Sequence, residues 1–409
     1  MFRIKAISII LLLLCSISSN AQLSIGFSLP PKQDKAEIPF SESCNLIIVP
    51  VIINNFLKLN FILDSGVDTP ILTEKAFANL AGIEFIREIS ISGAGLEDSI
   101  GAYIGHHVDI KLPGNIHGQN LNLLVLKEDY LKLSEKLGID VHGIIGYDLF
   151  KNFVVAINYD DKILTLTKPS SFKCNRKYRS IDLEISNSKP FIQTLLTNDK
   201  SSAPAKLMID TGASHALLLD VDQTEICPPN HTIVAQLGTG LGGIIPGNLG
   251  RLDSFRVSEF EFDHVIVSIP EIDAYSQSIK RGSRQGTIGG DILSRLSPIF
   301  DYQNNKLYIR RADRYKNKFE FDMSGISIAA KGEFLDSLVV EHVRENSPAA
   351  ECGMLVGDHI LSINGFSLMT HKLSEIQRVL QKKPNHKVRI KLIRDNQKIK
   401  KVFRLKRTI

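Results

Sequence analysis

Residues 61–73 read FILDSGVDTPILT, and residues 207–219 read LMIDTGASHALLL. Each stretch places an aspartate, a hydroxyl residue and a glycine between two apolar runs that are typical of buried strands. A single triplet of this kind is usually a turn, because Asp and Gly are common turn residues. An ionised carboxylate is costly to bury, however, so an aspartate that ends an apolar strand needs either stabilising partners or a chemical role.

The two triplets belong to an internal repeat. Asp64 and Asp210 lie 146 residues apart, and the features that follow them recur in the same order. These features are a glycine-rich turn (Gly93 and Gly95; Gly238 and Gly240), a glycine pair (Gly143 and Gly146; Gly286 and Gly289), and a strand and turn that include Asn158 or Asp301. Four features in one order at nearly constant spacing indicate two copies of one module. We place the copies at residues 37–170 and 171–312.

Each copy is predicted to be mainly β. Short runs rich in Val, Ile and Leu, such as NLIIVPVII and FEFDHVIVSI, are bounded by Gly, Pro, Asn and Asp, a pattern that indicates strands. Segments such as TEKAFANLAGI and DYLKLSEKLGI have helical spacing and predict single short helices. The alternation of strands and helices that a doubly wound fold requires is missing from both copies.

The repeat gives the paired aspartates a chemical explanation. Two related lobes can pack about a pseudo-twofold axis, and a turn near that axis brings its carboxylate against the other copy. Two adjacent carboxylates share one proton, because both cannot ionise cheaply. The ionised member can then take a proton from water while the protonated member donates to a carbonyl oxygen. That reaction is amide hydrolysis, and it needs no metal and no cofactor.

The residues DSGV and DTGA, each after an apolar strand and each with a later apolar-glycine pair, resemble the active-site loops of pepsin-like and retropepsin-like aspartic proteases. The resemblance implies two homologous acid-protease β-barrel lobes that form a pseudo-dimer, with Asp64 and Asp210 as the catalytic dyad. It assigns an interlobe grip to Ser65 and Thr211, close backbone approach to Gly66 and Gly212, and substrate-binding flaps to the glycine turns at Gly93, Gly95, Gly238 and Gly240. Two similar flaps resemble a fused retroviral dimer more than the single-flap pepsin arrangement.

Val67 and Ala213 occupy positions where pepsin-like loops can carry a hydroxyl residue. A hydroxyl there donates a hydrogen bond to the carboxylate, which favours its charged form and lowers its pKa. Neither Val67 nor Ala213 can donate such a bond. We therefore expect a working pH milder than that of a gastric protease.

Residues 313–409 form a separate unit in this reading. The stretch ENSPAAECGMLVGDHILSINGFSL predicts a short helix from Ser347, a turn at Gly357 and a strand over 360–363, and HKLSEIQRVLQ predicts an amphipathic helix. The unit resembles an α+β PDZ domain of the bacterial protease-associated type. That resemblance implies a peptide groove at Gly325, Ile326, Leu373, Ile376 and Leu380, with backbone amides of residues 324–327 holding a terminal carboxylate. A docking domain without a ligand remains the alternative.

The amino terminus predicts export. Residues 1–21 carry Arg3 and Lys5, an apolar stretch and small residues before Ala21, which is the pattern of a secretory signal peptide. Residues 22–36 are expected to be a linker, and lipid anchoring at Cys15 is disfavoured because bulky Leu14 precedes it. The destination is periplasmic or extracellular. No later segment approaches the 18 apolar residues of a membrane-spanning helix.

Composition sets further limits. The chain has 409 residues and a formal charge of +5, which falls to +3 without Arg3 and Lys5, so nucleic acid is not an expected partner. Four cysteines survive cleavage (Cys44, Cys174, Cys227 and Cys352), and the sequence does not choose among their three full pairings.

The sequence therefore predicts an exported aspartic endopeptidase that acts on peptides or unfolded proteins, with no cofactor and no metal, and with a PDZ domain for peptide docking or regulation. A non-catalytic peptide-binding scaffold built from the same domains is the alternative. A metal or nucleotide enzyme is poorly supported, because the sequence lacks a phosphate loop, and His106 and His107 lack a matching cluster of ligands.

Overall fold

The computed structural model describes residues 26–95, 99–271 and 284–409. The predicted signal peptide, Cys15 and residues 96–98 of the first predicted flap lie outside these ranges. None of the helices in the described ranges is long and apolar enough to cross a membrane. The four described cysteines, Cys44, Cys174, Cys227 and Cys352, are all free thiols.

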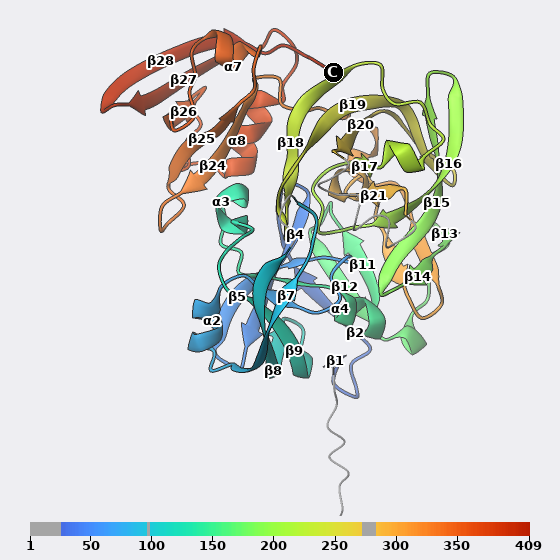
Figure 1. The fold of residues 1–409 in the computed structure, drawn as a ribbon. Helices are drawn as coiled ribbons and strands as arrows, with labels where there is room; N and C mark the ends of the chain where they lie inside the picture. The colour runs from blue at the N-terminus through green and yellow to red at the C-terminus, as the bar shows by residue number, and fades with distance from the viewer. Residues whose placement is uncertain (1–25, 96–98, 272–283) are drawn as a thin grey trace, which may run out of the picture.

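The first lobe is built on a nine-stranded sheet (Figure 1). Its strand order is β1-β9-β6-β10-β5-β4-β8-β7, with β3 paired to β4, and an additional pairing of β8 with β9 closes six strands into a ring of pairings. The elements are β1 (Gly26–Ser28), β3 (Ser41–Ser43), β4 (Leu46–Ile53), β5 (Leu57–Leu63), β6 (Ile71–Leu72), α2 (Lys75–Leu80), β7 (Glu84–Ile91), β8 (Ile100–Leu112), β9 (Ile116–Leu126), α3 (Leu133–Leu137), β10 (Gly143–Ile145) and α4 (Tyr147–Asn152).

The second lobe repeats this arrangement. Its eight-stranded sheet has the order β14-β15-β16-β21-β17-β20-β19-β18, and pairing of β15 with β19 again closes six strands into a ring. The elements are β14 (Glu184–Ser186), β15 (Lys189–Asn198), β16 (Ser201–Ile209), β17 (Leu217–Leu219), η2 (Val221–Gln223), β18 (Thr232–Gly240), β19 (Gly243–Val257), β20 (Phe260–Pro270), β21 (Gly286–Ile288) and α6 (Gly290–Leu293).

A third sheet joins the two lobes. Its order is β13-β23-β22-β11-β12-β2, and the central antiparallel pair β11–β22 aligns Val155 with Phe300 and Ala156 with Ile299. One continuous hydrophobic cluster extends through both lobes and this sheet. The elements are β2 (Lys35–Pro39), β11 (Val154–Asn158), β12 (Ile163–Thr167), η1 (Pro169–Ser171), β13 (Arg179–Asp182), β22 (Ile299–Asp301), β23 (Lys306–Ile309) and η3 (Asp313–Lys316).

The carboxy-terminal unit has its own hydrophobic cluster, which begins at Met323 and ends at Leu405. Its five-stranded sheet has the order β24-β25-β26-β27-β28, so β24 is an edge strand. Figure 1 shows the unit beside α3 of the first lobe and β18 of the second. The elements are β24 (Ile326–Lys331), β25 (Ser337–Val343), α7 (Pro348–Glu351), β26 (His359–Ile363), α8 (Leu373–Leu380), β27 (Lys387–Arg394) and β28 (Gln397–Arg404).

The mainly β class predicted from the sequence is confirmed, but two connecting segments differ from expectation. The expected linker over residues 22–36 contains β1, which pairs with β9 through Phe27 and Gly118, because the buried Phe27 ring needs the apolar surface of the first lobe. The segment that follows residue 312 does not enter the last unit at once. Phe319 is buried against Phe262 of the second lobe, so this stretch packs on the lobes before the PDZ cluster begins.

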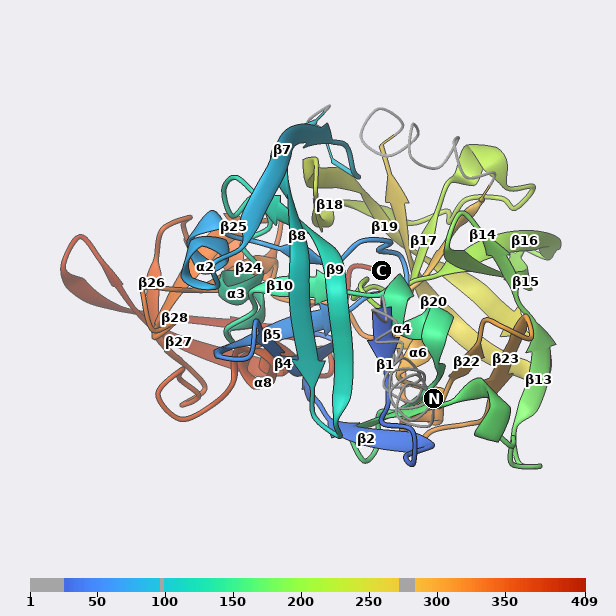
Figure 2. The same cartoon turned by 90° about the horizontal axis from the view of Figure 1, so that it is seen from below.

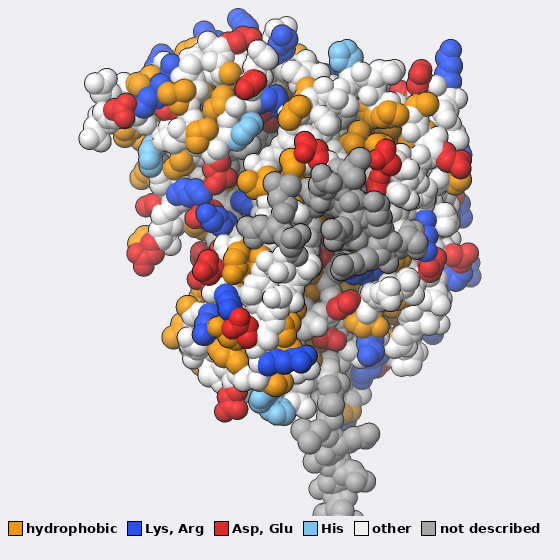
Figure 3. All heavy atoms as spheres, in the orientation of Figure 1, with side chains coloured by type: hydrophobic (Ala, Val, Ile, Leu, Met, Phe, Trp, Pro, Cys, Tyr) orange, Lys and Arg blue, Asp and Glu red, His pale blue; other side chains and the backbone are white. Residues whose placement is uncertain are grey.

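Charge is mixed over the face drawn in Figure 3, where basic and acidic side chains are interspersed over both lobes and the last unit.

Candidate active site

The first triplet lies where β5 ends. The apolar run Phe61, Ile62 and Leu63 is buried and pairs in parallel with β10, with Leu63 opposite Ile145. The Asp64 backbone N–H donates to the carbonyl of Ile145 at 2.8 Å, which continues the ladder by one residue. The chain then turns, and the Gly66 N–H donates to Asp64 Oδ1 at 2.6 Å.

The second triplet repeats these bonds. β16 pairs in parallel with β21, with Ile209 opposite Ile288. The Asp210 N–H donates to the Ile288 carbonyl at 2.9 Å, and the Gly212 N–H donates to Asp210 Oδ1 at 2.8 Å. Each carboxyl is therefore oriented by the amide of the glycine that follows it, which gives that glycine a role beyond the turn.

The hydroxyl residues of the two triplets hold the turns together across the lobes. The Ser65 N–H donates to Thr211 Oγ1 at 2.9 Å, and the Thr211 N–H donates to Ser65 Oγ at 3.1 Å. Ser65 Oγ in turn donates to the Ile209 carbonyl at 2.8 Å, and Thr211 Oγ1 donates to the Leu63 carbonyl at 2.8 Å. Both side chains are almost completely buried, so these four bonds are shielded from water.

This arrangement brings the two predicted dyad residues together. A Cβ atom on Gly212 would overlap the Asp64 carboxyl group, and a Cβ atom on Gly66 would lie 3.5 Å from Asp210 Oδ2. Asp64 keeps some exposed surface but is surrounded by protein atoms. Burial, followed by the charge of the neighbouring Asp210, raises the pKa of Asp64 well above its usual range, although the Gly66 amide opposes this shift. The pair therefore retains a proton at a pH where a free aspartate would be ionised.

The predicted glycine pairs lie directly beneath the two turns. Gly146 follows β10, and a Cβ atom there would overlap the Asp64 carbonyl oxygen. Gly289 follows β21, and a Cβ atom there would overlap the His215 carbonyl oxygen. Only glycine lets these backbones approach so closely. The requirement explains why the glycine pairs recur in both copies.

The predicted flaps are the hairpins β7–β8 and β18–β19, which lie on the same side of the molecule in Figure 2. Gly93 and Gly95 lie in the loop after β7, and Gly238 and Gly240 lie at the end of β18. The two tips meet, because Gly95 forms an isolated bridge with Gly242 and the Gly242 N–H donates to the Ala94 carbonyl at 2.9 Å.

Each flap tip also packs on the opposite lobe. Leu241, from the second flap, packs against the first-lobe cluster that contains Ile48 and Ile144. Ala94, from the first flap, packs against Leu218 of the second lobe. The tips are therefore held by crossed apolar contacts as well as by backbone bonds.

Sequence analysis missed two residues near the dyad. His215 Nε2 is buried without a hydrogen-bond partner in the described residues, and burial lowers the pKa of His215 to about 4, although the charge of Asp210 opposes this. Burial, then the charge of Asp64, raises the pKa of Tyr302 well above its usual range. The one signal for His215 was its position five residues after Asp210; Tyr302 directly follows Asp301, which recurs as Asn158 in the repeat.

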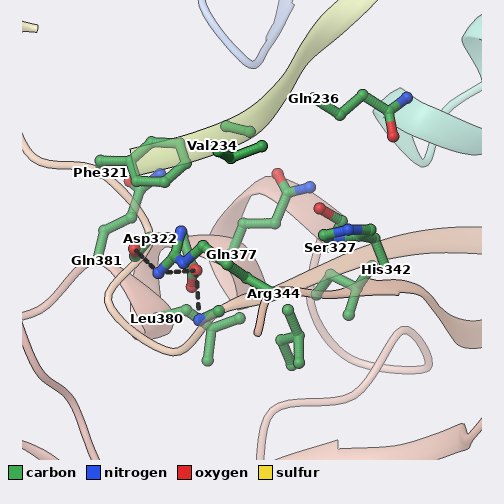
Figure 4. A pocket seen from close by; sticks show the side chains of 14 residues that line it. Val234, Gln236, Phe321, Asp322, Ser327, His342, Arg344, Gln377, Leu380 and Gln381 are labelled. Atoms are coloured by element: carbon green, nitrogen blue, oxygen red, sulfur yellow. Dashed lines mark hydrogen bonds and ion pairs between the residues drawn. The ribbon is translucent and has the colours of Figure 1, made fainter. Parts of the chain in front are cut away.

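The predicted PDZ groove residues separate into two groups. Gly325, Ile326 and Leu380 line a cavity of about 260 Å³ between β24 and α8 (Figure 4). Leu373 and Ile376 are fully buried in the unit and are not among the residues that line this cavity. Gln377 and Gln381 line the cavity from α8, and a groove role for Leu373 and Ile376 stays a prediction.

Among the described residues, no group of three or more His, Cys, Asp or Glu side chains is placed to hold a metal ion. Chemically, two adjacent carboxyls that share one proton can accept a proton from water and donate one to a polar group.

Comparison with known proteins supports the domain combination. Residues 195–292 match the family model described as aspartyl protease, and residues 339–394 match the model described as PDZ domain. The first match includes Asp210 but not Asp64. No curated protein matches the chain. The chain thus combines an aspartyl-protease-like region with a PDZ domain, as the sequence predicted.

Proposed function

We propose that this protein is an exported aspartic endopeptidase in which Asp64 and Asp210 share one catalytic site. The observation that carries the proposal is the reciprocal bonding of Ser65 and Thr211, because it joins the two repeats at the point where each carries its aspartate. The family match to the second copy supports protease chemistry in general. The equivalent bonds of the first copy extend that support to Asp64.

In the proposed mechanism the two carboxyls have different roles. Asp64, whose pKa is raised by burial and by Asp210, holds the shared proton and donates it to the carbonyl oxygen of the scissile peptide bond. Asp210 takes a proton from the attacking water, so that water adds to the carbonyl carbon and gives a tetrahedral diol. Asp210 passes the proton that it took from water to the leaving nitrogen while Asp64 takes a proton from a diol hydroxyl. The carbon–nitrogen bond then breaks, an amine and a carboxylic acid are released, and the pair again shares one proton.

The substrate class follows from the two hairpins. Because their tips meet at the bridge between Gly95 and Gly242, we infer that a substrate either displaces them or passes beneath them as an extended chain. A strand-like peptide or an unfolded protein fits that route, whereas a folded protein surface does not. We further propose that the PDZ domain binds peptides, and that residues 1–21 direct export to the periplasm or the medium.

The test is cleavage of denatured casein by residues 22–409 over a range of pH, with Asp64→Asn and Asp210→Asn beside the native chain. Both variants should lose activity while they keep their circular dichroism spectra. Asp199→Asn is the matched control, because Asp199 is exposed in the turn between β15 and β16, where its positive φ also suits asparagine. Folded protein without activity at any pH would instead support the non-catalytic scaffold.

A further inference from the structure

The carboxylate-binding position of the PDZ groove is already occupied by the protein's own Asp322. The Ser324 N–H donates to Asp322 Oδ1 at 3.1 Å, and the Gly325 N–H donates to Asp322 Oδ2 at 2.6 Å. The Ser324 hydroxyl also donates to Asp322 Oδ1, and its oxygen accepts the Ile326 N–H at 3.3 Å. These are the amides that the sequence predicted would hold the terminal carboxylate of a ligand.

A ligand carboxylate would therefore meet a carboxylate of like charge and amides that are in use. The nearest cation is Arg344, and its guanidinium lies 3.9 Å from Asp322 Oδ2, so it already partly balances that charge. Figure 4 shows Asp322 and Arg344 together at one end of the cavity, with Gln377 and Gln381 along α8. Like charges in a partly buried site repel, so the site disfavours a free carboxyl terminus.

The rest of the groove is suited to an extended chain. Among the described strands, β24 pairs only with β25, which leaves the N–H and C=O groups of its outer edge available for an added strand. The cavity has a second β wall, because Val234, Ala235 and Gln236 of β18 line it opposite β24. Val234 is 74% exposed, so its side chain is available to an apolar residue of a ligand.

The other end of the groove is covered by α3 of the first lobe. Lys331 is the last residue of β24, and its Nζ donates a hydrogen bond to Glu135 Oε2 of α3. The same Nζ lies 2.7 Å from Glu341 Oε1 of β25. Gly138, which follows α3, lies so close to Leu373 of α8 that a Cβ atom on it would approach the Leu373 Cβ within 2.5 Å. A strand that extended along the whole of β24 would therefore have to displace α3.

We propose that the groove between β24 and α8 binds an extended segment from the interior of a polypeptide, in competition with α3, and rejects free carboxyl termini. The inference rests on the proposed peptide binding by the PDZ domain and is independent of proteolysis. Asp322 sets the specificity by filling the amide site, and α3 sets the affinity by covering the far end of β24.

The experiment measures binding of one short acetylated Val/Thr peptide, made with either a carboxylate or a carboxamide at its C-terminus. The protein is the chain of residues 22–409 carrying Asp64→Asn, so that no peptide is cleaved. Anisotropy of fluorescein-labelled peptides gives Kd. Because the chain contains no tryptophan, Val234→Trp adds a single reporter to the groove, and Phe56→Trp, at a 61% exposed residue in the turn between β4 and β5 that does not line the cavity, is the matched control.

The carboxamide should bind at least as tightly as the carboxylate and should change the emission of Val234→Trp but not of Phe56→Trp. Asp322→Asn should tighten the carboxylate peptide by roughly tenfold, the value of one charge-assisted hydrogen bond, and leave the carboxamide within about twofold. Glu135→Gln should tighten both peptides by about two- to fivefold, because it weakens the ion pair that holds α3 on Lys331. As a control, Asp395→Asn replaces an exposed turn residue after β27 and should leave the Kd of both peptides unchanged.

Three results would overturn the proposal. The first is that the chain with Asp322 intact binds the carboxylate peptide ten times more tightly than the carboxamide peptide. The second is that neither peptide binds. The third is that Glu135→Gln leaves the Kd of both peptides unchanged. The first comparison needs no Asp322 variant, so it holds even if Asp322→Asn does not fold. Casein cleavage by the chain with Asp64 intact is measured separately, so failure of the groove proposal is distinguishable from failure of the protease proposal.

Discussion

Thr211→Val is the sharpest test of the reciprocal bonding between the lobes. Thr211 has no exposed surface, and valine reproduces the shape of its side chain without the oxygen. The substitution removes the acceptor of the Ser65 N–H, now at 2.9 Å, and the donor to the Leu63 carbonyl, now at 2.8 Å. Two buried backbone groups are left without these partners, one on each side of the first aspartate.

The magnitude follows from those two groups. Leaving a buried polar group unsatisfied costs about 1–3 kcal/mol, and the extra methyl group of valine returns about 1 kcal/mol through burial. We therefore expect the free energy of unfolding to fall by about 2–4 kcal/mol, a large part of the roughly 5–15 kcal/mol typical of a folded protein. We also expect kcat to fall by about a hundredfold, because a displacement of about 1 Å in a catalytic group can have that effect.

Urea unfolding and cleavage of a quenched fluorescent peptide measure the two effects. The matched control is Thr194→Val, because Thr194 is also buried in the second lobe but makes a single bond, from Oγ1 to the Ala205 carbonyl at 2.9 Å. In that control the free energy of unfolding should fall by about 1 kcal/mol, and kcat should be unchanged. If Thr211→Val loses no more stability than Thr194→Val and keeps full activity, the bonds between the lobes do not position the dyad.

Four further predictions concern the dyad, the glycines beneath it and the flaps. Because burial and the adjacent Asp210 raise the pKa of Asp64, activity should persist above about pH 3.9 and decline as pH rises through that raised pKa; a cleavage profile that peaks below about pH 3 would contradict this. Asp64 has a lower pKa in the unfolded chain than in the folded chain, so its ionisation opposes folding above about pH 3.9. Asparagine cannot ionise, so Asp64→Asn should raise Tm more at pH 7 than at pH 3. Gly146→Ala should abolish activity and lower Tm, because its Cβ would overlap the Asp64 carbonyl oxygen. The control Gly101→Ala meets only the flexible Lys127 side chain and should lower Tm only slightly. Equal Tm values in the two variants would contradict the packing argument. Leu241→Ala should raise KM for a peptide substrate, because it loosens the second flap from the first lobe. The control Ile244→Ala, at a half-exposed residue on the same hairpin, should leave KM unchanged. If KM is unchanged in both variants, the flap contact does not contribute to substrate binding.

Much of the two-lobed region could be predicted from the sequence because its signals are local and occur twice. The apolar runs before Asp64 and Asp210 specify strands, and the glycines after them specify turns, whatever the rest of the chain does. The constant spacing of the glycine pairs then indicated one repeated module, and the paired aspartates indicated the chemistry. The mainly β class and the PDZ unit are confirmed on this basis. The precise boundaries between the units and the catalytic roles remain predictions.

The pattern of one helix was insufficient to locate the PDZ groove. Leu373, Ile376 and Leu380 share an apolar face in the sequence and are all buried in the structure, but only Leu380 lines the cavity, and the first-lobe segment after α3 packs on Leu373. Amphipathic spacing shows which side of a helix is buried. It does not distinguish burial against a core from burial against a ligand, because both require apolar side chains.

The sequence by itself determined the repeat, the two aspartates and the family likeness of each unit, because these depend on residues that are neighbours along the chain. Tertiary structure alone decided the crossed contacts of Leu241 and Ala94, the burial of His215 and the cover that α3 places on β24. The bonds from Ser324 and Gly325 to Asp322 are local, between residues two and three positions apart, yet the sequence analysis did not predict them. Side chains that are far apart in sequence meet only when whole lobes pack, and no local pattern records which surfaces will face each other.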